Sequence, residues 1–391
     1  MKTIKDIEVL KGVKVLVRVD YNVPVANGVV VDDFRIRKSL QTISFLKEKG
    51  ARIILISHIE SGEKTSSGEP SLQPVADQLK KLGVTCTFVD NYRNANIVVE
   101  TLVDGDIVLL ENLRVNPGEK KNDPAFAKAL ASLADIYINE AFPVSHRAHA
   151  SVVGVPGFLP SYAGFVFADE VAHLSAAFTP KHPFIFILGG AKFETKLPLI
   201  EKFMKNADKV FVGGALANNF FKEKGLNVGT SLISPEDFNL KRYFNDPKLL
   251  LPIDVVVSDG TDVPKIKRIV EVSDGDTIMD AGPKTTALLQ GLLSEKPAQV
   301  LWNGPLGAYE KGFKQPTIDL AKAIAESSAH DGVNTIVGGA DTLATISDIK
   351  EVTGKTIESD FSFVSTGGGA MLDFLANETL PGIEALNSSK Q

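Results

Sequence analysis

The stretch Phe363–Leu375, FVSTGGGAMLDFL, places three consecutive glycines between a β-type run and an apolar run with helical spacing. Such a loop exposes backbone N–H groups at the start of a helix, where an anion can bind. The phosphate-loop pattern GxxxxGK[ST] is absent, because no lysine follows the glycines. The stretch therefore predicts a strand–loop–helix unit of an α/β fold and an anion site whose counter-charge lies elsewhere in the chain.

The same order, a Val- and Ile-rich run followed by a helix-spaced segment, recurs along most of the chain. We predict strands within residues 13–22, 51–58, 106–115, 134–142, 183–190, 209–219, 253–260, 276–285, 299–307, 334–342 and 361–370. Buried runs that alternate with helices are typical of parallel sheets covered on both faces, and such sheets bind ligands at the carboxyl ends of their strands. Because 391 residues exceed what one core usually serves, we predict two doubly wound parallel-sheet, Rossmann-like domains.

The boundary between the domains is predicted within residues 155–183, which begin with Gly and Pro and contain a helical pattern from Asp169 to Phe178. We expect a connecting helix there, between domains at about 1–165 and 166–375. Every adjacent glycine pair lies in the second predicted domain, and seven of the nine arginines lie in the first. Glycines at strand ends let a nucleotide approach the backbone, whereas arginines offer rigid forks for phosphate or carboxylate. A nucleotide holder and a small-anion holder in one chain indicate phosphoryl transfer.

Composition excludes several classes of protein. A net charge of −6 argues against a general nucleic-acid or membrane-surface binder. The single cysteine, Cys86, excludes an intrachain disulfide and makes a cysteine-based zinc site implausible. The start of the sequence has no long apolar stretch, and no run approaches the length of a bilayer span. We therefore expect a cytoplasmic protein without nucleic-acid or membrane partners.

Anion-binding motifs gather in the first half. RVDYNVP, at 18–24, places Arg, Asp and Asn on one predicted strand and its exit, and Arg114 follows another strand. Arg35 lies where a helix is expected to begin. In SHRAHAS, at 145–151, His146, Arg147 and His149 crowd a strand exit, which suits an anion. Metal binding by the two histidines is the competing interpretation, although no third ligand has a fitting spacing.

Nucleotide-binding motifs gather in the second half. GGAKFETK, at 189–196, places Lys192 and Lys196 four residues apart on one face of a predicted helix, beside exposed amides. Two ammonium groups in that position predict a polyphosphate site. Asp341, just beyond a glycine pair, is placed to hold Mg²⁺ on a bound nucleotide, and Glu310 to meet ribose hydroxyls.

Along nearly its whole length the chain resembles the phosphoglycerate kinase family. The motifs that carry the resemblance appear in the family's order: RVDYNVP, SH after the second strand, LLENLR, HRAHAS, GGAK, LPIDVVV, GPKT, WNGPLGAYE, GGADT and STGGGA. The resemblance implies reversible transfer of a phosphoryl group between 1,3-bisphosphoglycerate and Mg-ADP, giving 3-phosphoglycerate and ATP. It also implies a monomeric hinge protein whose tail, about 376–391, returns to the first domain.

The resemblance assigns roles to particular residues. It implies that 3-phosphoglycerate contacts Asp20, Asn22, Arg35, His58, Arg114 and Arg147. His146 and His149 would add to the surrounding basic patch. The nucleotide would contact Gly190, Ala191, Lys192, Lys196, Gly213, Asn303, Glu310, Gly338, Gly339, Asp341 and Thr342, with Asp341 as the metal ligand. The catalytic set would be Arg35, Lys192, Gly367 and Gly368, which stabilise charge on the phosphoryl group in flight.

Departures from the family pattern fall mostly in the first half. After His58 the family usually reads HLGRP, whereas this chain has Glu60 and places Ser61 at the arginine position. One positive charge that would face the phosphate is lost, and a negative charge is gained nearby. Lys64, a few residues further along the same loop, is the candidate to compensate for the lost charge. Pro143 replaces a usual glycine, and Thr230 lies where a GKS motif is frequent. The alternative to an active kinase is therefore a weakened nucleotide-binding paralogue with an altered glycerate site. A nicotinamide dehydrogenase is disfavoured, because no GxGxxG follows the first strand.

Overall fold

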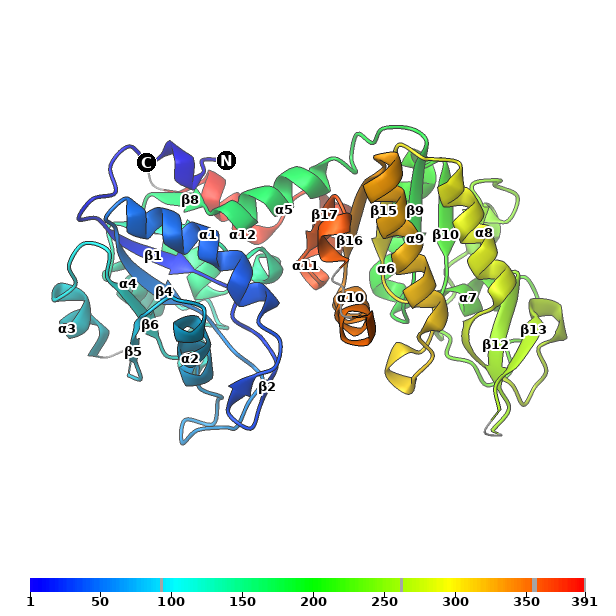
Figure 1. Cartoon of the computed structure of the whole chain (residues 1–391), viewed down its shortest axis with the longest axis horizontal. Coiled ribbons are helices and arrows are strands. Elements are labelled where there is room, and N and C mark those ends of the chain that lie inside the picture. The colour runs from blue at the N-terminus through cyan, green and yellow to red at the C-terminus, as the bar shows by residue number, and fades with distance from the viewer. Residues whose placement is uncertain (92–93, 261–262, 354–356, 390–391) are drawn as a thin grey trace. The chain divides into compact units, whose positions relative to one another are not determined.

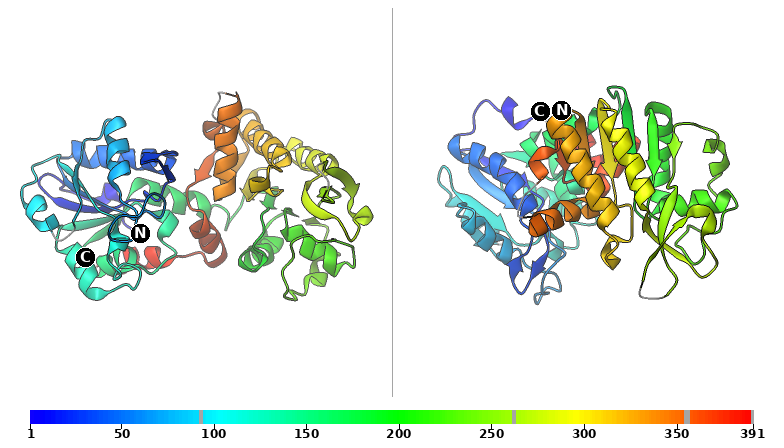
Figure 2. Two further views of the ribbon diagram at one scale, coloured as in Figure 1. Left: turned by 90° about the horizontal axis from the view of Figure 1, so that it is seen from below. Right: turned by 45° about the vertical axis from the view of Figure 1, so that its right-hand side comes forward.

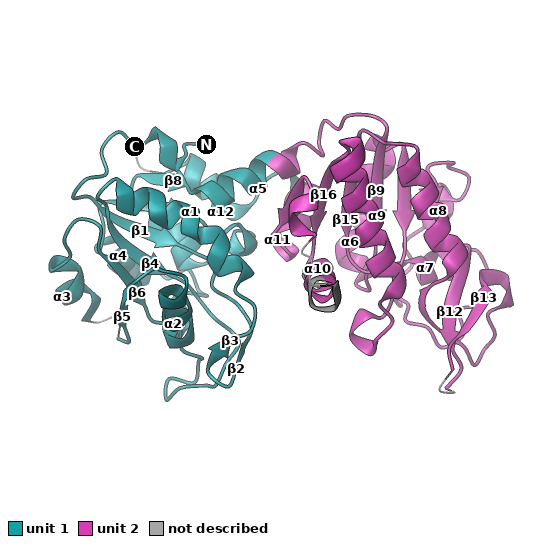
Figure 3. Ribbon diagram, viewed as in Figure 1, with its two compact units in different colours: residues 1–172, 377–391 teal, residues 173–376 magenta. Residues whose placement is uncertain are grey.

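The protein, described here as a computed structural model, forms two compact units. Unit 1 contains residues 1–172 and 377–391, and unit 2 contains residues 173–376 (Figure 3). The structure describes residues 1–91, 94–260, 263–353 and 357–389, without the side chains of 340, 341 and 350–353. Within these ranges, every helix is too short or too polar to traverse a lipid bilayer.

Unit 1 is built on a six-stranded sheet in the order β5-β6-β4-β1-β7-β8, in which all neighbouring strands are parallel. Its strands are β1 (Lys14–Arg18), β4 (Arg52–Ile56), β5 (Thr87–Val89), β6 (Ile107–Leu110), β7 (Ile136–Asn139) and β8 (Ser161–Ala163). The central strands are apolar and buried on both faces, as parallel sheets require. A hairpin of β2 (Val25–Ala26) and β3 (Val29–Val30) precedes the first helix.

Helices and short helical turns connect the strands of unit 1 (Figure 1). The α-helices are α1 (Phe34–Glu48), α2 (Gln73–Lys81), α3 (Ala95–Glu100), α4 (Pro124–Ala131) and α12 (Pro381–Asn387). The turns used below are the 3₁₀ turns η3 (Leu113–Val115) and η4 (Phe142–Val144) and the π-helical turn η5 (Ala150–Gly154).

The C-terminal helix α12 belongs to the first unit although it ends the chain. It contacts β8 and η5, and in Figures 1 and 2 it is the red helix beside the green elements of unit 1. The N–H of Gly382 donates to the carbonyl of Ser145 at 2.9 Å. A Cβ at Gly382 would lie 2.7 Å from the Ser145 side chain, so only glycine fits at this close approach.

Unit 2 repeats the architecture with a six-stranded parallel sheet in the order β11-β10-β9-β15-β16-β17. Its strands are β9 (Phe184–Leu188), β10 (Lys209–Val212), β11 (Leu249–Leu250), β15 (Gln299–Asn303), β16 (Asn334–Gly338) and β17 (Phe363–Ser365). The helices are α6 (Phe193–Asn206), α7 (Leu216–Glu223), α8 (Pro283–Ser294), α9 (Gln315–Asp331), α10 (Ala340–Thr353) and α11 (Gly369–Asn377). The predicted α/β class and parallel sheets are confirmed.

Two predicted strands of the second half do not join the parallel sheet. β12 (Asp254–Ser258) pairs antiparallel with β13 (Lys265–Arg268) and β14 (Thr277–Ala281) in a separate three-stranded sheet. Their apolar runs look alike in sequence to those of the main sheet, but only a short segment connects β12 to β13. Parallel pairing requires a crossover connection of a dozen or more residues.

The predicted connecting helix is α5 (Phe165–Ser175), which begins four residues before the predicted Asp169. The buried Glu140 carboxylate lies at its first turn, where Oε1 accepts hydrogen bonds from the Val166 N–H at 3.2 Å and the Thr42 hydroxyl at 2.5 Å. Burial raises the pKa of Glu140 to about 8. A side chain far away in sequence therefore satisfies N–H groups at the start of this helix.

Candidate functional site

A pocket of about 630 Å³ opens at the carboxyl ends of the strands in unit 2. Its wall is formed by the segments that follow β9, β10, β15, β16 and β17, together with β14 and residues 232, 252 and 255. A ligand site at this edge is expected for a doubly wound sheet, because the strand-to-helix loops converge there. The volume suits a nucleotide-sized ligand.

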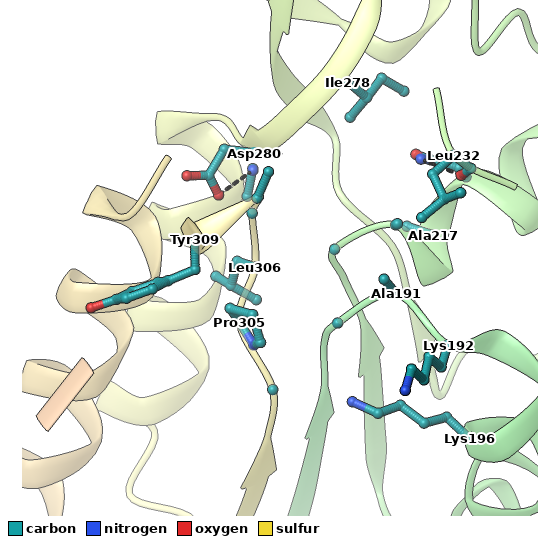
Figure 4. A pocket seen from close by; sticks show the side chains of 18 of the residues that line it. Ala191, Lys192, Lys196, Ala217, Leu232, Ile278, Asp280, Pro305, Leu306 and Tyr309 are labelled. Atoms are coloured by element: carbon teal, nitrogen blue, oxygen red, sulfur yellow. Dashed lines mark hydrogen bonds between the residues drawn. The ribbon is translucent and has the colours of Figure 1, made fainter. Parts of the chain in front are cut away.

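Two lysines form the cationic end of the pocket. Lys192 is the N-cap residue of α6, and Lys196 lies inside the first turns of that helix. Figure 4 shows both side chains with their ammonium ends directed into the pocket. The prediction that both lie on one helix face is wrong in detail, because Lys192 precedes the helix, but both line the site. Polyphosphate would meet two positive charges beside the N-terminus of a helix.

Lys196 is held in place by buried acceptors. Its Nζ donates to the Gly189 carbonyl at 2.5 Å and to Asn303 Oδ1 at 3.1 Å. Gly190 has φ +98°, a conformation that favours glycine, and a Cβ there would lie 2.8 Å from Lys196 Nζ. A side chain at this position would displace the ammonium group. The second glycine of the GGAK motif is therefore required for both its backbone conformation and the space it leaves for Lys196.

The other end of the pocket is apolar. Figure 4 places Ala217, Leu232 and Ile278 on the far side from the lysines, and Pro305 and Tyr309 along the wall between. Asp280, a buried lining residue, accepts a hydrogen bond from the N–H of Ala281 at 2.8 Å, and burial raises its pKa to about 8. An apolar end and a cationic end together match the base and the phosphates of a nucleotide.

Most of the residues of the second half that were predicted to bind the nucleotide or to take part in catalysis lie at this pocket. Those that line it are Gly190, Ala191, Lys192, Lys196, Asn303, Glu310, Gly339 and Gly368. Four others lie directly behind the lining or next to it in sequence: Gly213, Gly338, Thr342 and Gly367. Thr342, for example, is buried and accepts the Gly304 N–H at 3.2 Å. The side chain of Asp341 lies outside the described residues.

The glycine triplet lies where the opening stretch predicts. Gly367 and Gly368 connect β17 to α11, which begins at Gly369, and Gly368 and Gly369 line the pocket. The Gly367 N–H donates to Ser365 Oγ at 3.0 Å, which fixes the start of the loop.

A second set of predicted residues gathers in unit 1 around His58. The buried Arg18, at the end of β1, donates from Nε to Ser151 Oγ at 2.9 Å, and its NH2 lies 3.0 Å from His58 Nδ1. Burial and the nearby arginines lower the pKa of His58 well below its ordinary value, so the imidazole is neutral. His58 Nε2 is buried and has no hydrogen-bond partner within the described ranges. A buried ring nitrogen without a partner is a candidate ligand contact.

Asp20, Asn22 and Arg35 lie next to one another although Asp20 and Asn22 follow β1 rather than belonging to it. Arg35 NH1 lies 2.9 Å from Asp20 Oδ2 and donates to the Asn22 carbonyl at 3.0 Å. Asp20 Oδ1 accepts from the Asn22 N–H at 3.2 Å. The prediction that residues 13–22 form one strand is wrong at its end, because β1 stops at Arg18 and residues 19–24 have no regular secondary structure.

Arg114 and Arg147 meet at Glu60. Arg114, buried in η3, donates from NH1 to Glu60 Oε1, and Arg147 NH1 lies 3.9 Å from the same oxygen. The hydrogen bond from Arg114 is the main cause of the lowered pKa of Glu60. Ser61 points elsewhere, since its hydroxyl accepts the Val25 N–H at 2.9 Å. Lys64 shows no contact with these arginines among the described contacts.

The two histidines of SHRAHAS have different surroundings. His146 Nε2 lies 3.3 Å from Arg147 Nε, whereas His149 Nδ1 lies 3.9 Å from Glu119. Burial and nearby arginines lower the pKa of His149 to about 4. No group of three or more His, Cys, Asp or Glu side chains suited to a metal ion occurs in the part of the chain that the structure describes.

Several residues at the two sites had no role in the sequence analysis. The buried Glu119 accepts from the Ser151 hydroxyl at 2.6 Å and so orients the partner of Arg18. Leu232 and Asp280 also line the pocket of unit 2, and neither was assigned a role from the sequence. Tertiary packing brings such residues to the site from segments that are distant in sequence, and local sequence patterns do not show which segments will meet.

Comparisons with known proteins agree with this geometry. The family model described as phosphoglycerate kinase matches residues 4–378. A phosphoglycerate kinase of Thermosipho africanus is 40% identical over 404 aligned residues, covering 100% of this chain and 98% of that protein. One from Moorella thermoacetica is 41% identical over 398 residues, covering 98% of each.

Solved structures show the same relationship. Phosphoglycerate kinase from Coxiella burnetii superposes with a TM-score of 0.83 at 34% identity, covering 99% of both chains. The enzyme from Pyrococcus horikoshii gives a TM-score of 0.82 at 28% identity, covering 99% of this chain and 98% of that one. None of these matches supports the alternative of a weakened nucleotide-binding paralogue with an altered glycerate site. The chain belongs to the phosphoglycerate kinase family.

Proposed function

We propose that the chain transfers a phosphoryl group reversibly between 1,3-bisphosphoglycerate and Mg-ADP, giving 3-phosphoglycerate and ATP. The observation that carries the proposal is the lysine-lined pocket of unit 2, in a chain that matches phosphoglycerate kinases from end to end. Mg²⁺ enters as part of the nucleotide substrate, with Asp341 as its protein ligand. We further propose that the protein acts as a monomer.

The two units take different substrates in this proposal. Residues 1–165 with the tail 376–391 bind 3-phosphoglycerate, through the charged and polar groups around His58. Residues 166–375 bind the nucleotide, with its base at the apolar end of the pocket and its phosphates at Lys192 and Lys196.

The reaction needs little covalent chemistry from the protein. The donor is an acyl phosphate whose leaving group is a carboxylate, so no strong general base is required. Catalysis rests on positioning and on stabilising charge at the equatorial oxygens of the phosphoryl group. The proposed groups for this task are Arg35 of unit 1 and Lys192, Gly367 and Gly368 of unit 2.

Steady-state phosphorylation of 3-phosphoglycerate by Mg-ATP, with the acyl phosphate trapped by hydroxylamine, tests the proposal. Wild-type protein is expected to turn over, and Lys192→Ala to lose most of its kcat. Lys205→Ala is the control, because Lys205 is exposed on the same helix outside the pocket. Absence of turnover at saturating substrates, with intact Mg-ATP binding, would refute the proposed activity.

A further inference from the structure

The Glu60 side chain lies where the charged groups of unit 1 converge. Oε1 accepts from Arg114 NH1 and lies 3.9 Å from Arg147 NH1, and Oε2 accepts from Asn22 Nδ2 at 3.2 Å. All three partners belong to the set proposed to bind 3-phosphoglycerate. We infer that the Glu60 carboxylate is an internal ligand of this arginine cluster, one that an anionic group of the substrate must displace. The inference rests on the proposed function for the identity of that substrate.

The loop that carries Glu60 is fixed by the surrounding scaffold. The Glu60 N–H donates to Asn22 Oδ1 at 2.9 Å. The buried Asn112 holds the preceding residue, Ile59, by accepting its N–H at 3.3 Å and donating to its carbonyl at 2.9 Å. On the other side Ser61 accepts a backbone N–H of β2. The Glu60 carboxylate therefore reaches the arginines from a backbone that is held in place by hydrogen bonds on both sides.

The two partners differ in their exposure, and this favours exchange. The Arg114 side chain is 4% exposed, whereas that of Glu60 is 49% exposed. A buried guanidinium without a counter-charge is costly, so Arg114 requires an anion in both states of the site. The half-exposed carboxylate can return to water by side-chain rotation without a large desolvation change. Removal of Glu60 by an incoming anion is therefore favourable only when that anion takes its place on Arg114.

The cluster retains polar atoms that Glu60 does not reach. His58 Nε2 and Arg114 Nε are both buried without a hydrogen-bond partner within the described ranges. Glu60 supplies two oxygens and one charge, whereas a phosphate supplies more oxygens and greater charge. A substrate oxyanion can thus replace Glu60 and also satisfy atoms that the carboxylate leaves unpaired.

Other acids near the cluster are engaged differently. Asp20 pairs with Arg35, and Glu119 accepts from both the N–H and the hydroxyl of Ser151. Glu119 is fully buried and Asp20 nearly so, which holds both in place. Among these three acids, Glu60 is the exposed one, and its carboxylate can therefore move away from the arginines into solvent.

Isothermal titration calorimetry of the full chain, at fixed ionic strength, tests the inference with two probes: inorganic phosphate and 3-phosphoglycerate. The variant is Glu60→Gln, which removes the charge and keeps the shape, and Glu60→Gly removes the whole side chain. Glu63→Gln is the matched control, the same chemical change at an exposed residue of the same loop. We expect both Glu60 variants to bind inorganic phosphate and 3-phosphoglycerate about tenfold more tightly, and the control to change less than twofold.

The outcomes separate this inference from the proposed function. Equal or weaker phosphate affinity in a folded Glu60→Gln or Glu60→Gly protein, relative to Glu63→Gln, overturns the internal ligand. A gain in phosphate affinity in the Glu60 variants supports the internal ligand even if the protein does not phosphorylate 3-phosphoglycerate. In that case only the proposed function is refuted. A gain of equal size in the Glu63→Gln control would show a general effect of loop charge and would overturn the inference.

Discussion

Arg35 forms an ion pair with Asp20, with 2.9 Å between NH1 and Oδ2. The pair joins the segment after β1 to the first turn of α1. The Asp20 side chain is 5% exposed and that of Arg35 is 25% exposed, so the buried carboxylate fixes a guanidinium that still reaches the surface. An arginine held in this way loses little conformational entropy on meeting a phosphoryl group.

Replacement of Arg35 is expected to separate chemistry from nucleotide binding. Arg35→Ala should lower kcat by about a thousandfold, as loss of an arginine that stabilises transition-state charge does in other phosphoryl transfers. ADP affinity should stay nearly unchanged, because the nucleotide pocket lies in unit 2. Arg37→Ala is the control, because Arg37 lies two residues further along α1 and forms its ion pair with Asp33 instead. Preserved turnover in Arg35→Ala would remove Arg35 from the catalytic set.

Asp341 lies three residues beyond the end of β16, at the start of α10. If it holds the Mg²⁺ of the nucleotide, Asp341→Ala should raise the magnesium concentration needed for half-maximal turnover by about tenfold. Asp373→Ala, an exposed position on α11, should leave that concentration unchanged. An unaltered magnesium dependence in Asp341→Ala would exclude this ligand.

Glu140 predicts a pH dependence of stability. Its pKa is about 8 in the folded protein, against an ordinary value of 4.5. Between these two values the folded state keeps a proton that the unfolded state has lost, so stability falls as pH rises. The slope is at most about 1.4 kcal/mol per pH unit, the value for one proton.

Thermal unfolding between pH 5 and pH 8 checks this sign. Glu140→Gln should reduce the decline in melting temperature with rising pH, whereas Glu48→Gln, exposed on α1, should retain it. An identical pH profile in wild type and Glu140→Gln would contradict the assignment.

Asn112 is expected to be a major contributor to the stability of unit 1. Its side chain makes four hydrogen bonds to the backbone of Ile59, Pro70 and Arg114. Asn112→Ala leaves those buried groups unpaired and should lower the free energy of unfolding by about 3 kcal/mol. Urea denaturation measures the loss. Gln73→Ala, at an exposed position of α2, should change it by less than about 0.5 kcal/mol.

Much of the fold could be predicted from strand-like runs separated by helical patterns. The β9-to-α6 unit is an example, because its apolar run, glycines and lysines are contiguous in sequence. The cluster around His58 was only partly predictable. Its members come from six separate segments, and the contact between Glu60 and Arg114 depends on how β4 and β6 pair. The antiparallel pairing of β12 and β14 was not predicted, because β13, which lies between them in sequence and pairs with β12, is mostly charged and gives no strand-like apolar run.

The position of α12 has a consequence for the order of synthesis. In the sequence α12 follows all of unit 2, yet it covers η5 and β8 of the unit whose other residues are made first. Unit 2, which is continuous from 173 to 376, has its complete sequence before α12 exists. The unit whose sequence is made first is therefore completed only after unit 2, and a chain that stops before α12 would leave the surface of unit 1 at η5 and β8 uncovered.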